Sequence, residues 1–214
     1  MSLSDRLENC YTGIVHDVMQ EMGFRDFTLP PELRPLLPER RLAGPAWTFS
    51  GSIKQGTDPY QTVYEWTGVL SRAPAGHVLV CQPNDSTIAH MGELSAETLK
   101  LKGVRGYIVD GGCRDSEFIV DIGFQVFCRY FTPRDVLNGW LPHGFEDPIS
   151  IGDATINSGD YVLADRDGVV VLPAKAAEVI VNNAETAMAT EDQVRAAILN
   201  GMDPQEAFVK FQKF

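Results

Sequence analysis

Apolar positions along this chain form two patterns, one with helical spacing and one of short unbroken runs. The two patterns alternate along the sequence. Near the N-terminus, helical spacing predicts one helix over residues 4–22, with Ser4 at its start and Gly23 after its end. The apolar positions that carry this prediction are Leu7, Cys10, Ile14, Val18 and Met22. Residues 27–42 are rich in proline and polar groups, which is typical of an extended connection.

In the middle of the chain, short apolar runs predict strands and longer periodic stretches predict helices. The expected strands are 46–50, 77–81, 106–109 and 125–129, and the expected helices are 58–71, 92–102 and 115–122. Gly103 and Gly123 follow two of these helices, as is common at helix ends. Strands that alternate with helices predict an α/β fold, with helices on the faces of a parallel or mixed sheet.

After residue 147 the pattern changes to closely spaced strands followed by helices. Strands are expected at 148–151, 154–157, 160–164 and 168–172, with turns that suit antiparallel hairpins or a small barrel-like cap. Helices are expected at 174–189, 191–199 and 204–212. Because no long low-complexity linker interrupts the chain, we expect one α/β domain over 1–214, with its core over about 10–190 and a helical tail over about 191–214.

Composition and charge narrow the class of protein. Hydrophobic residues make up 44% and charged residues 22%, which is ordinary for a globular chain. No apolar run approaches the roughly 20 residues that span a bilayer, and the N-terminus lacks the pattern of an export signal. The formal net charge of -11, without a basic cluster, disfavours a nucleic-acid partner. We therefore expect a cytoplasmic protein with no membrane or nucleic-acid partner.

The four cysteines are too widely spaced for a zinc cage or a disulfide framework. They are Cys10, Cys81, Cys113 and Cys128, and three of them lie in or beside apolar strand-like runs. A thiol in such a run is usually a small buried hydrophobe, so reduced, buried cysteines are expected.

The first of two motifs that could carry chemistry is Gly92-Glu93-Leu94-Ser95, at the start of the expected helix 92–102. The first turn of a helix has N–H groups without an internal acceptor, and it lies at the positive end of the helix dipole. Such a turn suits a carboxylate, and glycine allows the ligand to approach closely. Taken alone, the motif also matches an ordinary helix start.

The second motif is Arg114-Asp115, which follows the expected strand 106–109 and a glycine turn. Open α/β sheets bind ligands at the carboxyl ends of their strands. Asp115 offers a hard oxygen ligand for Mg²⁺ or Mn²⁺, and Arg114 offers a planar fork that matches a carboxylate. The plain alternative is a surface ion pair in which Asp115 caps the next helix. Because a helix and one returning strand connect the two motifs, we expect both at one edge of the sheet.

These motifs and their flanks resemble one known family. The matching segments are Gly92-Glu93-Leu94-x-Ala, the run Lys-Gly-Val-x-Gly-x-x-x-Asp-Gly-x-x-Arg-Asp that ends at Asp115, Gly123-Phe124-x-Val-Phe, Gly44-Pro45-Ala46 and the segment that begins at Gly159-Asp160. They are similar to the family that joins the class II 4-hydroxy-4-methyl-2-oxoglutarate aldolases to the regulator of ribonuclease activity A. The resemblance covers about residues 10–190.

The resemblance implies a fold, an assembly and roles for the two motifs. The implied fold is a three-layer α/β/α swivelling domain, like phosphohistidine domains, and the implied assembly is a homotrimer or a hexamer. It implies that backbone N–H groups of Gly92, Glu93, Leu94 and Ser95 bind a pyruvyl substrate. Arg114 would hold the substrate and its enolate, Asp115 would ligate the metal, and Glu93 would contact a metal-bound water. One position departs from the family pattern, since Phe118 stands where the aldolases carry an acid, with Glu117 and Asp121 nearby.

We therefore predict a lyase that uses Mg²⁺ or Mn²⁺ to cleave or decarboxylate a pyruvyl-type 2-oxo acid, such as 4-hydroxy-4-methyl-2-oxoglutarate or oxaloacetate. Its catalytic residues would be Arg114 and Asp115. A second hypothesis is a protein-binding regulator of a ribonuclease, and a third is a related sugar-acid lyase or dehydratase. Other side chains are given plain roles: His90 could line the pocket, although a loop histidine is more often solvated, and Ser95 is expected to cap a helix rather than act as a nucleophile.

Overall fold

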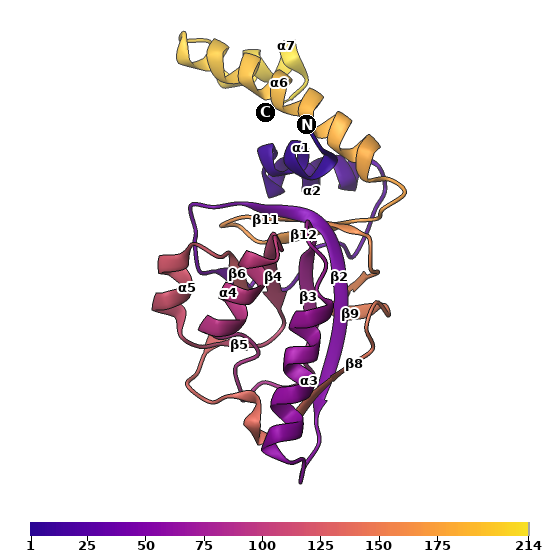
Figure 1. Ribbon diagram of the computed structural model, residues 1–214. Coiled ribbons are helices and arrows are strands. Elements are labelled where there is room, and N and C mark those ends of the chain that lie inside the picture. Colours follow the sequence, from indigo (N-terminus) through magenta and orange to yellow (C-terminus); the bar gives the residue numbers. More distant parts are fainter. Residues whose placement is uncertain (214) are drawn as a thin grey trace.

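The computed structural model describes residues 1–213, and its centre is an eight-stranded mixed sheet (Figure 1). The strand order is β1-β6-β4-β3-β2-β11-β12, and β8 pairs with β2 beyond that path. The strands are β1 (Arg34–Pro35), β2 (Leu42–Ile53), β3 (Val78–Gln82), β4 (Gly106–Val109), β6 (Val126–Cys128), β8 (Trp140–His143), β11 (Tyr161–Ala164) and β12 (Val169–Leu172). Strands β2, β3, β4 and β6 run parallel, and the others join antiparallel. The expected mixed α/β sheet is confirmed.

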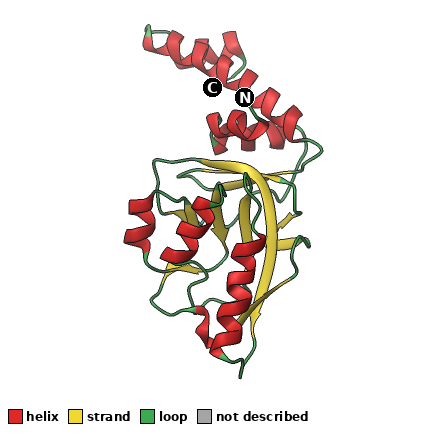
Figure 2. Cartoon of the chain, in the orientation of Figure 1, coloured by secondary structure: helices red, strands yellow, loops and turns green. Residues whose placement is uncertain are grey.

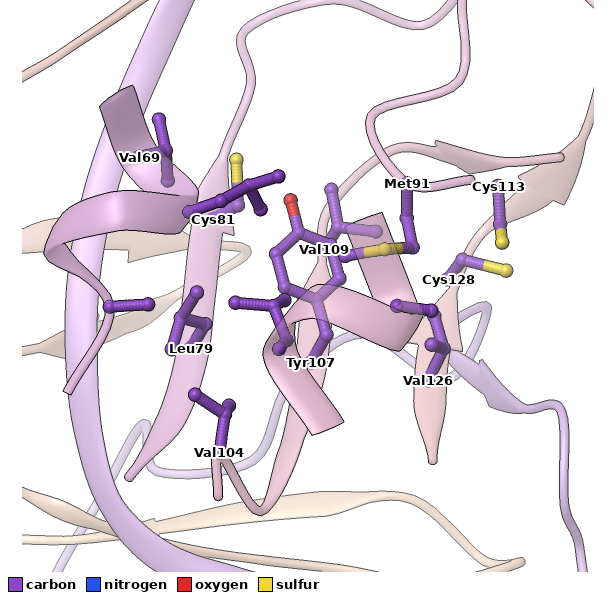
Figure 3. Close-up of a cluster of buried hydrophobic side chains, with 14 of the residues drawn as sticks. Val69, Leu79, Cys81, Met91, Val104, Tyr107, Val109, Cys113, Val126 and Cys128 are labelled. Atoms are coloured by element: carbon purple, nitrogen blue, oxygen red, sulfur yellow. The ribbon is translucent and has the colours of Figure 1, made fainter. Parts of the chain in front are cut away.

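Three helices cover one face of the parallel strands (Figure 2). They are α3 (Pro59–Arg72), α4 (Glu93–Leu101) and α5 (Ser116–Ile122), close to the predicted bounds. Figure 3 shows Tyr107 of β4 within the cluster that they bury, beside Cys81, Val109 and Met91. The buried Tyr107 hydroxyl donates to the carbonyl of His90 at 3.1 Å. This bond satisfies the hydroxyl and ties the loop that follows β3 to the core.

The opposite face is covered by a hairpin and, at one end of the sheet, by helices. The hairpin of β9 (Ile149–Ile151) and β10 (Ala154–Ile156) packs its apolar side chains against Val80, Ile108 and Phe127. Helices α1 (Leu3–Asn9), α2 (Thr12–Glu21) and α6 (Ala177–Leu199) pack on β11 and β12, and α7 (Pro204–Phe211) follows α6 at the top of Figure 1. Two shorter elements, β5 (Gly112–Cys113) and β7 (Tyr130–Phe131), pair in parallel, and a single 3-10 turn, η1, spans Val136–Asn138.

The N-terminal helix was predicted wrongly as one piece. It breaks at Cys10, whose backbone is extended with ψ 171, and it starts after Ser2 rather than Ser4. The second helix begins where the N–H and hydroxyl of Thr12 donate to the carboxylate of Asp165, at 2.8 Å and 2.7 Å. An acceptor 153 residues away therefore sets this helix start, which local spacing alone does not reveal.

Three C-terminal and edge predictions also need correction. The break expected near residue 190 is absent, and α6 is continuous, because no glycine or proline interrupts residues 177–199. Strand β2 begins at Leu42 rather than residue 46, because its first residues pair with β11. Hairpin β11–β12 extends the main sheet instead of forming a barrel-like cap. The antiparallel pairing of both predicted hairpins is confirmed.

Other sequence predictions fare as follows. All four cysteines are buried, as expected. Across residues 1–213, no helix is long and apolar enough to cross a membrane. The swivelling-domain subclass, the single-domain division, the cytoplasmic location and the trimeric or hexameric assembly stay predictions.

Candidate active site

The two motifs meet because they follow neighbouring strands. Strands β3 and β4 are parallel partners, and helices α4 and α5 begin just beyond their carboxyl ends. The intervening loops are joined by backbone hydrogen bonds: Arg114 N–H donates to Met91 C=O at 2.9 Å, and His90 N–H donates to Gly112 C=O at 2.8 Å. This short ladder fixes the loop before α4 against the turn before α5.

Asp115 faces the start of α4 rather than its own helix. One of its oxygens, Oδ2, accepts the N–H of Glu93 at 3.2 Å and lies 3.4 Å from Arg114 Nε. Asp115 has left-handed backbone angles, φ 55 and ψ 35, and makes no side-chain capping bond to α5. Asp115 therefore occupies the N-cap position of α5 and pairs with Arg114, as the plain alternative expects, but its carboxylate serves α4 and not its own helix.

Glycine is needed at position 92 because the side chains of Asp115 and Arg114 come close to its backbone, not because the backbone conformation requires glycine. Its φ of -145 lies in the extended region that any residue adopts. A Cβ at this position would stand 2.8 Å from Asp115 Oδ2 and 3.2 Å from Arg114 Nε. The glycine thus leaves the space in which the carboxylate and the guanidinium lie.

Arg114 lies between two carboxylates, one of which the sequence did not reveal. Its Nη1 is 3.3 Å from Asp135 Oδ2. Asp135 also accepts the N–H of Leu137 at 3.0 Å, which starts the η1 turn. An aspartate before a short apolar stretch signals a cap, but nothing in the sequence connects it with Arg114.

A cavity of about 500 Å³ opens beside these groups. Gly92, Glu93, Leu94, Ser95, Arg114 and Asp115, all named from the sequence, line it. The structure adds Asp135 and a set of apolar or aromatic residues from α3, η1 and the loop before α4, namely Val63, Trp66, Leu70, Met91, Val136 and Leu137. Ser95 accepts the indole N–H of Trp66 at 2.9 Å and thus joins α4 to α3, so the expectation that it caps a helix is wrong.

His90 is buried with 0% of its surface exposed, so the expectation of a solvated loop residue is wrong, whereas the alternative that it lines the pocket is confirmed. Its ring packs edge-on against Trp140, with 5.2 Å between ring centroids. Among the described residues, neither ring nitrogen has a hydrogen-bond partner, and Nε2 lies 3.6 Å from Asp85 Oδ2, which is beyond hydrogen-bond length. Burial lowers the pKa of His90 to about 4 and outweighs the opposing charge of Asp85, so the ring is neutral at pH 7.

Acid should therefore destabilise the protein in part through His90. Its pKa falls from 6.5 to about 4 on folding, so between these values the unfolded state binds the proton more tightly. The stability is complete above the unfolded pKa and declines as the pH falls toward the folded value, by about 3 kcal/mol in all. Urea unfolding between pH 7.5 and 4.5 should show this decline for wild type and a much shallower one for His90→Gln. His77→Gln, at a partly exposed position, should keep the wild-type slope, and equal slopes in all three proteins would contradict the assignment.

The oxygen donors at the cavity mouth suit a hydrated divalent cation. Mg²⁺ and similar ions are commonly held by one or two carboxylates and keep several waters, and Asp115 and Glu93 supply two carboxylates here. Within residues 1–213, no three His, Cys, Asp or Glu side chains gather into a metal-binding group, as a closed zinc site would require. The donor set therefore fits Mg²⁺ or Mn²⁺, and binding stays a prediction.

Comparison with known proteins places these residues in a family context. The family model described as RraA-like, Aldolase/RraA, matches residues 12–171. Protein DlpA of Legionella pneumophila is 28% identical over 96% of this chain, and the match covers only 33% of the length of DlpA. A Halalkalibacterium halodurans protein named "Putative 4-hydroxy-4-methyl-2-oxoglutarate aldolase" is 25% identical over 85% of this chain and 83% of its own.

A solved structure shares both fold and sequence with the chain. Streptomyces coelicolor RraAS2, described as an unusual member of the RNase ES inhibitor RraA protein family, superposes with a TM-score of 0.79 at 26% identity. The match covers 90% of this chain and 95% of RraAS2.

Proposed function

The chain belongs to the RraA-like family, and from that premise we propose that it is a metal-dependent lyase that cleaves a carbon–carbon bond of a pyruvyl-type 2-oxo acid. One observation carries the proposal: the Asp115 carboxylate accepts the first N–H of α4 and lies beside Arg114 at a cavity of about 500 Å³. This arrangement combines donors for a substrate carboxylate with positive charge for a developing enolate. Retro-aldol cleavage of a 4-hydroxy-2-oxo acid and decarboxylation of oxaloacetate both pass through that enolate.

Each protein group has a distinct task in this proposal. The N–H groups of Leu94 and Ser95 lie in the first turn of α4, where the helix offers no internal acceptor, and they would bind the substrate carboxylate. Arg114 would donate to the 2-keto oxygen and stabilise it more strongly as negative charge develops. Asp115 would hold the metal, with Glu93 in contact through water. When bound, the metal supplies Lewis-acid stabilisation of the same oxygen.

The bond changes of the retro-aldol reaction balance without an additional reactant. The C3–C4 bond breaks, and its electron pair becomes the C2=C3 double bond of the pyruvate enolate. The C4 hydroxyl loses its proton and becomes the carbonyl of the leaving aldehyde or ketone. A proton then returns to C3 and gives pyruvate. Glu93 lines the cavity, and we assign it the transfer of this proton.

Enolate formation can be tested without knowledge of the natural substrate. The protein is incubated with pyruvate in D₂O, with Mg²⁺ or with EDTA, and methyl-proton exchange is followed by NMR. Oxaloacetate decarboxylation is measured in parallel, with the rate of buffer plus metal subtracted. We expect both activities with Mg²⁺ and neither with EDTA. If neither exceeds the metal-only blank, the proposal is rejected.

A second candidate function, regulation of a ribonuclease, has specific observations in its favour. Phe118, which stands where family aldolases carry an acid, is 54% exposed, and the chain has a net charge of -11. RraAS2 is described as related to an RNase ES inhibitor. This function predicts that the protein binds and inhibits a ribonuclease of that type at micromolar concentration. Absence of inhibition would exclude the regulator function.

The third hypothesis, a sugar-acid lyase or dehydratase, is tested separately. Analysis of the products formed from hydroxy acids would distinguish it from the aldolase.

A further inference from the structure

The cavity beside Arg114 has two chemically distinct walls, and they differ in what they can bind. Its polar wall comes from the start of α4 and the turn before α5, with Asp135 at the edge. Its other wall comes from α3 and η1 and is apolar, with Val63, Trp66, Thr67, Leu70, Val136 and Leu137. Resting on the proposed function, we infer that the leaving half of the substrate is uncharged and apolar. The substrate class is then a 4-hydroxy-2-oxo acid with an alkyl or aryl group on C4, instead of a second carboxylate.

The charge balance of the cavity disfavours a second substrate carboxylate. Among the described residues that line it, Arg114 is the sole cation, while Glu93, Asp115 and Asp135 are acidic. Arg114 already lies 3.4 Å from Asp115 and 3.3 Å from Asp135. In the proposed reaction it also serves the pyruvyl half. In the proposed reaction the metal at Asp115 serves the pyruvyl half too, so a carboxylate on the leaving half would find no counter-ion of its own.

The polar side chains of the apolar wall already have partners within the protein. The Thr67 hydroxyl donates to the carbonyl of Tyr64 at 2.9 Å, and the Trp66 indole donates to Ser95 at 2.9 Å. Thr98, which borders this wall, donates to the carbonyl of Leu94 at 2.7 Å. A carboxylate placed here would lose its water without gaining donors, which is costly, whereas an alkyl group would lose nothing.

Nearby basic side chains are also engaged elsewhere. Lys102 Nζ donates to the carbonyls of Leu70 and Ser71 at 2.7 Å and 2.6 Å, at the end of α3. The Arg72 guanidinium lies 4.5 Å from the ring centroid of Phe145. His90 directs Nε2 toward Asp85, 3.6 Å away, and its Nδ1 toward Gly111, where a Cβ would lie within 2.6 Å. Lys102 and Arg72 do not line the cavity, and the ring nitrogens of His90 point toward Asp85 and Gly111, so none of these three groups supplies a cation to the apolar wall.

A pair of matched substrates tests the inference. Wild type with Mg²⁺ is given 4-hydroxy-2-oxohexanoate, which has an ethyl group on C4, and 4-hydroxy-2-oxoglutarate, which has a carboxylate there. We expect kcat/KM to be at least about 10-fold higher for the ethyl compound, because one apolar group in a fitted pocket changes rates by about this factor. As a binding test, 2-oxohexanoate should inhibit at lower concentration than 2-oxoglutarate.

A charge added to the apolar wall should reverse the preference. Thr67→Arg places a guanidinium on the cavity side of α3, and it should shift the ratio of the two kcat/KM values toward the dicarboxylate by at least about 10-fold. Gln61→Arg adds the same charge to the same helix at an exposed position outside the cavity, and it should leave the ratio unchanged. Thermal unfolding of both variants establishes that they fold.

The outcomes separate this inference from the proposed function. Preference of wild type for the dicarboxylate, in cleavage and in inhibition, overturns the inference and leaves the lyase proposal intact. Metal-dependent exchange of pyruvate protons without cleavage of either compound likewise overturns the inference about the leaving half and leaves the proposed enolate chemistry intact. Absence of exchange together with absence of cleavage overturns both.

Discussion

Replacing Asp115 with asparagine should lower kcat/KM for carbon–carbon cleavage by about 10³-fold while the fold is retained. Asparagine tolerates the left-handed backbone that Asp115 adopts, with φ 55, and its amide oxygen can still accept the N–H of Glu93. The substitution therefore removes charge with little change of shape. A group that stabilises developing charge is typically worth 10² to 10³ in rate, and loss of the metal ligand adds to that loss.

The control for this substitution lies on the same helix. Asp121→Asn removes a charge from an exposed position of α5 outside the cavity, so activity should stay at the wild-type level. Titration with Mn²⁺, followed by electron paramagnetic resonance, gives a readout independent of turnover: Asp115→Asn should weaken binding and Asp121→Asn should not. Wild-type activity in Asp115→Asn, or activity that persists in EDTA, would exclude the proposed role of this carboxylate.

The parts of the site that local sequence determines could be predicted. The spacing of apolar residues and the glycines at 103 and 123 located helices α4 and α5 to within a residue or two. Parallel strands place the starts of successive helices at one edge of a sheet, so Gly92 and Asp115 were expected to meet. The structure brings them together, although the chemical roles assigned to them await experiment.

The parts that depend on tertiary contacts could not be predicted. Asp135 reaches Arg114 through the η1 turn, and no periodic pattern connects the two. His90 is in a polar-looking loop, yet Tyr107 holds its carbonyl and Trp140 covers its ring. Likewise, Asp165 begins α2 from across the chain. Each case is a single side-chain contact between distant segments, which sequence spacing does not encode.

These supporting contacts explain how a site built on loops can be held in place. Three contacts hold this region: the Tyr107 hydroxyl and the backbone ladder between residues 90–91 and 112–114 fix the loop before α4, and the bond from Trp66 to Ser95 fixes the first turn of α4. Catalytic groups need to be positioned to within a fraction of an ångström, and such support provides it. A small displacement at the junction of the two motifs should therefore affect activity far more than stability.

Gly92→Ala is the substitution that creates such a displacement. The new methyl group would stand 2.8 Å from Asp115 Oδ2 and 3.2 Å from Arg114 Nε, so one or both side chains must move. The backbone conformation, with φ -145, suits alanine, and a carboxylate at the cavity mouth can shift at little cost. We expect the free energy of unfolding to change by less than about 1 kcal/mol and kcat/KM to fall by about 10²-fold, since a misplacement of about 1 Å has effects of that size.

The matched control is Gly68→Ala on α3, where an added Cβ meets nothing within 4 Å. Alanine in a helix interior should stabilise the protein by about 0.5–1 kcal/mol and leave kcat/KM unchanged. The two variants thus add the same methyl group, one against the Asp115–Arg114 pair and one in open space. If Gly92→Ala keeps wild-type kcat/KM and Mn²⁺ affinity, then the closeness of the α4 start to Asp115 is a packing feature, and the chemistry must be sought elsewhere in the cavity.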